Sequence, residues 1–193
     1  MAFPTPLPRL PSSRPIPSPP ELPLPTMPDI LESSRRQGLR LRLRTIGPFF
    51  RVTAEGLGGS ELGRVEGLIR RWIDGKILHL DSIRMSRETL AMDRSIFGLG
   101  LFVGAAAVRH GFDRGCRRAE LLAIDDSPLF HSRLVRFYTR MGFRAVREVD
   151  GSSMGDLAHM LVWGGRGTRM DADVELLLRR WSKKLKILMA VQT

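Results

Sequence analysis

The sequence predicts a mixed α/β domain in which antiparallel strands come first and helices and strands alternate afterwards. The chain has 193 residues, of which 42% are hydrophobic and 26% charged, so one packed domain with an appended segment is expected. Period-two strand patterns precede a strongly apolar helix pattern near the middle of the chain, and single strands alternate with helices after it. Eleven of the 13 prolines lie between Pro4 and Pro28, which sets the beginning of the chain apart from the domain.

Residues 1–45 are predicted to be a disordered segment rich in Pro and Arg. Proline fixes φ and lacks an amide donor, so this stretch suits neither a helix interior nor a central strand. Arg and Ser occur early and the first acidic residue is Glu21, a composition typical of an organelle transit peptide. We expect a chloroplast destination, with mitochondrion or cytoplasm as alternatives. A proline-rich linker or a ligand for a partner domain is the other interpretation.

Each later element follows from a local pattern. Asp74-Gly75 between two apolar runs predicts a tight hairpin, and Gly142 is a natural helix C-cap. The domain is expected over residues 46–168, and residues 169–193 are expected to form a C-terminal amphipathic helix. The predicted strands are Phe49–Ala54, Gly63–Ile73, Lys76–Met85, Arg118–Ile124, Ala145–Val149 and Asp156–Trp163, and the predicted helices are Gly98–Phe112, Pro128–Met141 and Asp171–Met189.

The charge and cysteine content exclude several classes of protein. The net charge is +11, and 27 of the 31 basic residues are arginine, which suggests nucleic acid or a smaller anion. The folded part shows no recognition helix and few aromatics among its basic residues, so no nucleic-acid partner is expected. One cysteine excludes a disulfide framework and a thiolate-rich zinc site, and no metal is expected. The longest uncharged run, Ser95–Val108, is too short to span a membrane.

A glycine-rich helix start lies at Gly98-Leu99-Gly100-Leu101, with Gly104 one turn later. Free N–H groups in the first turn of a helix bind phosphate, and glycine lets the ligand approach the backbone. Close packing against another helix is the alternative reason for the glycines. The spacing fits neither a dinucleotide-binding fingerprint nor a P-loop.

Two runs of sequence resemble the central motifs of the GNAT superfamily of acyl-CoA N-acyltransferases, including its plant organellar members. These runs are FGLGLFVGAAAVRHGFDRGCRRAELLAI and HSRLVRFYTRMGFRAV, and the resemblance extends over roughly residues 60–163. Its most specific part is Phe137-Tyr138-x-x-Met141-Gly142-Phe143. The resemblance implies a mostly antiparallel mixed sheet flanked by helices. It also implies that the family's opening strand and two helices are shortened here, since Leu39–Leu62 is too short to hold them.

The resemblance further implies a coenzyme A site. The amides of Gly98, Leu99, Gly100 and Leu101 would hold the pyrophosphate, and backbone N–H groups at Ile83 and Met85 would hold the oxyanion. This sequence departs from the family at Ser95, where Arg or Gln is usual and Arg94 stands one residue early. It departs again at His131, which occupies the usual Asn position. These positions, Arg94, Ser95 and His131, are candidate cofactor-binding residues.

Four residues are candidates for proton transfer. Tyr138, the only tyrosine, would protonate the leaving thiolate, since phenol and thiol are close in basicity. His79 and Asp81 alternate on one face of an otherwise apolar strand, and Glu66 lies on the strand before it. Polar groups on a buried strand suggest a base for the attacking amine. The alternative for each is a structural role.

These observations predict an N-acetyltransferase that transfers an acetyl group from acetyl-CoA to an amine by direct attack. The acceptor would be an amine-bearing small molecule, or the N-terminus or a lysine of a protein. The alternative is a non-catalytic GNAT-like protein that binds coenzyme A or acts as an interaction module.

Overall fold

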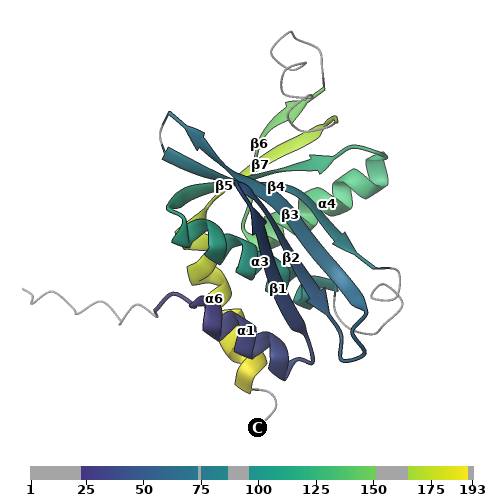
Figure 1. Ribbon diagram of the computed structural model, residues 1–193. Coiled ribbons are helices and arrows are strands. Elements are labelled where there is room, and N and C mark those ends of the chain that lie inside the picture. The colour runs from purple at the N-terminus through teal and green to yellow at the C-terminus, as the bar shows by residue number, and fades with distance from the viewer. Residues whose placement is uncertain (1–22, 74, 87–95, 151–164, 191–193) are drawn as a thin grey trace, which may run out of the picture.

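The computed structural model describes residues 23–73, 75–86, 96–150 and 165–190. In these ranges seven strands form one sheet in the order β1-β2-β3-β4-β5-β7-β6, in which only β4 and β5 run parallel (Figure 1). The strands are β1 Arg40–Ile46, β2 Phe49–Glu55, β3 Glu61–Trp72, β4 Gly75–Met85, β5 Cys116–Ile124, β6 Arg144–Val149 and β7 Gly167–Asp173. The helices are α1 Met27–Arg36, α3 Ile96–Asp113, α4 Pro128–Met141 and α6 Val174–Ala190. The predicted fold class, a mixed and mostly antiparallel sheet with helices packed on it, is confirmed.

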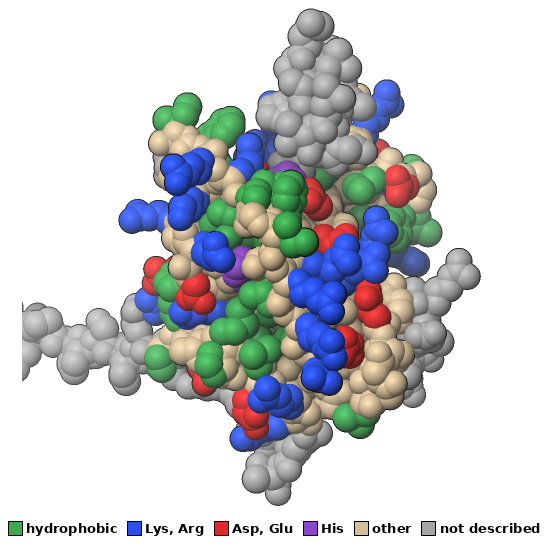
Figure 2. Space-filling model, in the orientation of Figure 1, with side chains coloured by type: hydrophobic (Ala, Val, Ile, Leu, Met, Phe, Trp, Pro, Cys, Tyr) green, Lys and Arg blue, Asp and Glu red, His purple; other side chains and the backbone are tan. Residues whose placement is uncertain are grey.

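One hydrophobic core joins these helices to a single face of the sheet. The core contains Leu78 of β4, Leu121 of β5, Phe102 of α3, Tyr138 of α4 and Trp181 of α6. The opposite face carries a small separate cluster made by residues of β5 and β6, to which no helix of the described residues contributes. Charged side chains of both signs lie over the strands in the view of Figure 2, which has the orientation of Figure 1. Charged residues on this face are therefore placed by the strands alone.

The strand and helix predictions between Phe49 and Val149 are confirmed to within a few residues. The β3–β4 hairpin places Trp72 opposite Gly75, whose φ of 120° favours glycine. The bounds of α4 are those predicted, with the Ser127 side chain accepting from Phe130 N–H at its start. Gly142 ends the helix at φ 119°. The strand predicted at Asp156–Trp163 lies outside the described residues.

The prediction that residues 1–45 are disordered is wrong for their last part. Thr26 and Asp29 form a capping box that begins α1, and Ile30 is fully buried in the core. β1 then follows and pairs along its length with β2. The proline-rich composition hid this helix because Pro25 and Pro28 stand beside the cap and in the first turn, where proline is tolerated.

The shortened beginning that the sequence predicts is found, because β1 and β2 are joined directly at Gly47-Pro48 with no helix between them. One further boundary differs from the sequence prediction. At the other end, α6 begins at Val174, because residues 167–173 form β7 between β5 and β6. The C-terminal segment predicted from residue 169 therefore begins inside the sheet. No helix of the described chain is long and apolar enough to cross a membrane.

Candidate active site

An opening between β4 and β5 lies at their carboxyl ends. The two strands pair from Lys76 and Cys116 as far as Leu80 and Leu121, and pairing stops there. Beyond this point the end of β4 stays paired with β3, while the end of β5 stays paired with β7. Ligands of open α/β sheets bind outside the carboxyl ends of diverging strands. We therefore expect a ligand to bind in this opening and to extend from one face of the sheet to the other.

A β-bulge directs the end of β4 away from β5. The β3–β4 register shifts between Glu66 and Gly67, so that Gly67 lies opposite Leu80 and Glu66 opposite Ser82. A Cβ atom at Gly67 would lie 2.2 Å from the carbonyl oxygen of His79. Only glycine permits this close approach of the two strands.

Backbone N–H groups on β4 face the opening. Neighbouring residues of an antiparallel strand direct their N–H groups to opposite edges. Ser86 N–H donates to the Leu62 carbonyl on β3 at 2.9 Å, so the N–H groups of Met85 and Ile83 are directed to the other edge. No strand of the described chain pairs with that edge, since β5 has diverged. The arrangement agrees with the oxyanion role predicted for Ile83 and Met85.

A buried cluster of charged side chains lies immediately before the opening, on the face without helices. His79 of β4 and Glu120 of β5 are opposite each other, and both are essentially inaccessible to solvent. The Nδ1 of His79 lies 3.0 Å from Glu120 Oε1, and its Nε2 lies 3.0 Å from Asp81 Oδ1. Arg70 Nε donates to Glu120 Oε1 at 2.8 Å, and Arg169 Nη2 donates to Oε2 at 3.3 Å. Each oxygen of the buried Glu120 is therefore bound by a cation.

The cluster changes the protonation of both central groups. Burial opposes the charged imidazolium, but hydrogen bonds to Asp81 and Glu120 outweigh it and raise the pKa of His79. Burial likewise opposes the Glu120 carboxylate, but His79 and Arg70 outweigh it and lower the pKa of Glu120. The result is an ionised Glu120 carboxylate that keeps the His79 imidazole protonated to higher pH than usual. Asp81 is about half exposed and connects this histidine to solvent.

A hollow of about 440 Å³ on the same face contains two of the predicted residues, Asp81 and Glu66. Apolar side chains of the β1–β2 hairpin, among them Ile46 and Phe49, form part of its wall. Glu66 is ion-paired with Arg51 at 2.5 Å and accepts from Ser82 at 3.4 Å, so its charge is compensated within the protein. Asp81 is 47% exposed against 25% for Glu66, so it is the more accessible carboxylate for a cationic ligand.

Tyr138 lies on the other face of the sheet, in the core between α4 and the strands. Its ring packs edge-on against Phe137 and Phe143. Burial raises the pKa of Tyr138 to about 12, so the phenol is fully protonated at neutral pH and can act only as a proton donor there. The sheet therefore lies between Tyr138 and the His79–Asp81 pair.

The predicted phosphate site at the start of α3 lies only partly within the described residues. The helix begins at Ile96, so Gly98 lies in its first turn, where helices offer N–H groups to a ligand. Leu99, Gly100 and Leu101 follow inside the helix, and the side chains of Leu99 and Leu101 are buried in the core. A Cβ at Gly100 would lie 3.0 Å from Phe137 of α4, so this glycine permits helix packing. Arg94 and Ser95 lie outside the described residues.

His131, predicted to contact the cofactor, has a partner within the protein. Its Nε2 lies 2.8 Å from Thr168 Oγ1, and that hydroxyl donates to Glu148 Oε1 at 2.8 Å. The chain of contacts ties the first turn of α4 to β7 and β6. His131 therefore has a positioning role for α4, which carries Tyr138.

The sequence did not single out Glu120, Arg70 or Arg169 as functional. The available signal was Glu120 itself, a carboxylate in the apolar run Ala119–Ile124. Arg70 is 50 residues away in the chain, and nothing in the local pattern joins the two. No group of His, Cys, Asp and Glu side chains in the described ranges could hold a metal ion.

The comparisons with known proteins identify solved acetyltransferase structures. No family model and no curated protein matches the sequence. The spermidine N-acetyltransferase from Vibrio cholerae in complex with CoA and spermine is similar at 16% identity and a TM-score of 0.48, over 68% of this chain and 69% of that one. Nourseothricin acetyltransferase is similar at 16% identity and a TM-score of 0.46, over 71% and 85% of the two chains. A putative acetyl transferase from Pyrococcus furiosus has 20% identity and a TM-score of 0.44, over 55% and 66%.

Proposed function

We propose that this protein is an N-acyltransferase of the GNAT type, which transfers the acetyl group of acetyl-coenzyme A to an amine. The observation that carries the proposal is the opening between β4 and β5, which has N–H groups of Ile83 and Met85 at its edge and proton-transfer groups on both faces. Tyr138 in its GNAT-like motif lies on one face, and the Asp81–His79–Glu120 chain lies on the other.

The residues of this chain fit acetyl-coenzyme A as a co-substrate. Among the described residues no strand pairs with the outer edge of β4, and its N–H groups can bind an extended amide-containing arm. Gly98 in the first turn of α3 offers its amide to a phosphate. Acetyl-coenzyme A supplies the activated thioester when it is bound. The N–H groups of Ile83 and Met85 then hold the thioester oxygen as negative charge develops on it.

The acceptor amine occupies the hollow that contains Asp81, on the face opposite Tyr138. The Asp81 carboxylate attracts the ammonium form and accepts its proton, and the His79 Nε2 holds this carboxylate in position. Asp81 passes this first proton to solvent, and the neutral amine nitrogen forms a bond to the acyl carbon. As the bond from that carbon to sulfur breaks, the nitrogen gives its second proton to Asp81, and the departing thiolate takes the proton of the Tyr138 hydroxyl. Tyr138 regains a proton from solvent, so one proton is released for each ammonium that is acetylated.

Turnover of acetyl-CoA with a panel of polyamines, amino acids and peptide N-termini, followed by thiol release, tests this function. We expect Tyr138→Phe to lower kcat by about 10²-fold with little change in the KM for acetyl-CoA, because general acids contribute on this scale. Asp81→Asn should raise the KM for the amine and shift the rising limb of the pH profile. Ser132→Ala, an exposed change on α4, is the matched control and should leave turnover unchanged.

Two outcomes would contradict parts of the proposal. Unchanged turnover in Tyr138→Phe would remove the acid role from this residue. Saturable binding of coenzyme A without turnover of any amine in the panel would overturn the enzymatic proposal and support the non-catalytic coenzyme A-binding module.

We also propose that the proline-rich start of the chain directs the protein to an organelle, with the chloroplast as the expected destination. The early Arg and Ser residues and the absence of acidic residues before Glu21 support this. Residues 1–25 fused to a fluorescent protein should accumulate in plastids of plant cells. A diffuse cytosolic signal would contradict the targeting role.

A further inference from the structure

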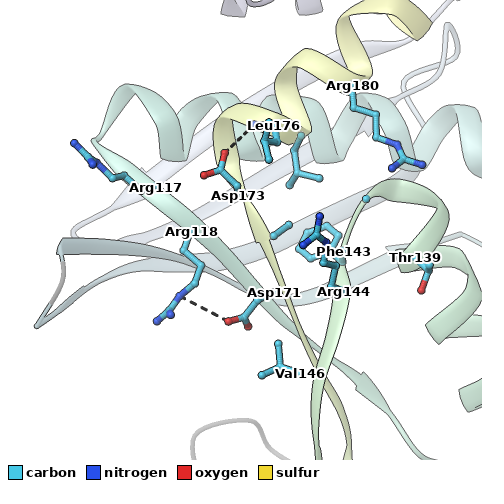
Figure 3. A pocket seen from close by; sticks show the side chains of 13 residues that line it. Arg117, Arg118, Thr139, Phe143, Arg144, Val146, Asp171, Asp173, Leu176 and Arg180 are labelled. Carbon is cyan, nitrogen blue, oxygen red and sulfur yellow. Dashed lines mark hydrogen bonds and ion pairs between the residues drawn. The ribbon is translucent and has the colours of Figure 1, made fainter.

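A second concave site lies at the opposite end of β5 from the opening. It has a volume of about 830 Å³, within the range of roughly 300–1,000 Å³ that small-molecule sites occupy. Its walls come from the beginnings of β5 and β6, the ends of β7 and α4, and the first turns of α6. Figure 3 shows the pair formed by Arg118 and Asp171 toward one side, Arg180 on the other, and Phe143 with Arg144 between them.

Four arginines line this cavity, and most of their charge is uncompensated. Arg117 and Arg144 have no ion pair with any carboxylate of the described residues, and Arg180 has only a hydrogen bond to the Arg140 carbonyl at 3.3 Å. These arginines come from three separate elements, β5, β6 and α6, so no local sequence repeat explains their convergence.

The fourth arginine, Arg118, has an incomplete partner. Its Nε lies 3.8 Å from Asp171 Oδ2, which is beyond hydrogen-bond distance, and this buried N–H has no partner in the described structure. Asp171 instead accepts from Arg169 at 3.1 Å. The second carboxylate of the cavity, Asp173, accepts from Leu176 N–H at 2.8 Å and so caps α6. Both carboxylates already accept hydrogen bonds from other groups, and the four arginines outnumber them.

We propose that this cavity binds a small organic phosphate. Guanidinium groups are planar donors that match phosphate oxygens in pairs, and several around one concavity favour an anion with more than one charge. Phe143 and Leu177 form an apolar floor beneath them, on which the carbon part of such a ligand packs. These arginines contribute to the net charge of +11, and they have no role in the proposed acyl-transfer site. The cavity is distinct from the proposed acetyl-transfer site, because none of its lining residues has a role in that reaction, although Phe143 packs against Tyr138.

Titration of the isotope-labelled full chain with inorganic pyrophosphate, followed by amide NMR shifts, tests the proposal. Saturable shifts are expected at Arg144, Ala172 and Leu176, and they should persist when coenzyme A is present at saturation. Arg144→Gln combined with Arg180→Gln should weaken this binding by at least ~10-fold, since two charge-assisted contacts are lost. If that variant does not fold, Arg117→Gln combined with Arg144→Gln tests the same cavity from its exposed rim.

The control is Arg40→Gln combined with Arg71→Gln, which removes the same charge at exposed positions outside the cavity. It should change the affinity by less than ~2-fold, because distant exposed charges are screened. Equal weakening in the cavity and control variants would show diffuse attraction and overturn the site. Shifts confined to the start of α3, or no saturable shifts, would overturn it as well.

Discussion

Replacing Glu120 by Gln tests the buried cluster that lies beside the opening between β4 and β5. Glu120 has no exposed surface, and it binds His79, Arg70 and Arg169. The amide keeps the shape of the side chain but removes its charge and places an N–H₂ donor beside two guanidinium groups. Breaking a buried ion pair by removing one partner costs about 3–5 kcal/mol. Arg70 and Arg169 keep 26% and 16% of their side-chain surface exposed, so water solvates part of the charge left without a partner. We therefore expect the free energy of unfolding to fall by about 3 kcal/mol.

Urea unfolding measures this loss directly. With an m-value of about 2 kcal/mol per molar urea, the transition midpoint should fall by about 1.5 M. The matched control is Glu175→Gln, which removes an exposed carboxylate paired with Arg179 on α6 and should change stability by less than about 0.5 kcal/mol. A midpoint shift for Glu120→Gln no larger than that of the control would refute the assignment of Glu120 as the centre of the cluster.

The pH dependence of the same variant gives a second measurement. The pKa of His79 is raised on folding, so its contribution to stability is complete below the usual pKa of 6.5 and is lost as pH rises through the folded value. The pKa of Glu120 is lowered, so its contribution is present above 4.5 and is lost as pH falls through the folded value. Glu120→Gln removes the contribution of the Glu120 carboxylate. It also removes one of the two carboxylates that raise the pKa of His79. Its stability should therefore vary less with pH on both sides of neutrality.

The remaining predictions concern the bulge and the start of the fold. Gly67→Ala should destabilise the protein by at least about 2 kcal/mol and weaken coenzyme A binding, because the added Cβ would lie 2.2 Å from the His79 carbonyl oxygen. Thermal unfolding and calorimetry measure the two effects, and Gly58→Ala, whose Cβ meets no atom within 4 Å, is the control. Equal effects of the two substitutions would contradict the role of the bulge. Ile30→Ala should lower the free energy of unfolding in urea by about 2–5 kcal/mol, because Ile30 is fully buried beside α3 and α6. A loss below about 1 kcal/mol would show that α1 is not part of the folded core.

The sequence by itself determined the elements whose signals are local. Alternating apolar residues predict β2, β3 and β4, and helical spacing of apolar residues before Gly142 predicts α4. The motif around Tyr138 can likewise be recognised from the sequence, because its residues lie on one helix and the turn after it. These features depend on neighbours within a few positions, which a linear pattern records.

Only the tertiary structure decided which polar groups meet. Glu120 is 41 residues from His79 and 50 residues from Arg70 in the sequence. Strand pairing brings these side chains together, and no local pattern specifies that pairing. The position of α1 depended on burial of Ile30 against helices far along the chain, which outweighed a proline-rich composition. The four arginines of the second cavity are scattered along the sequence, and the packing of β5, β6 and α6 brings them together. Long-range pairing and burial, which sum over the whole domain, set these contacts.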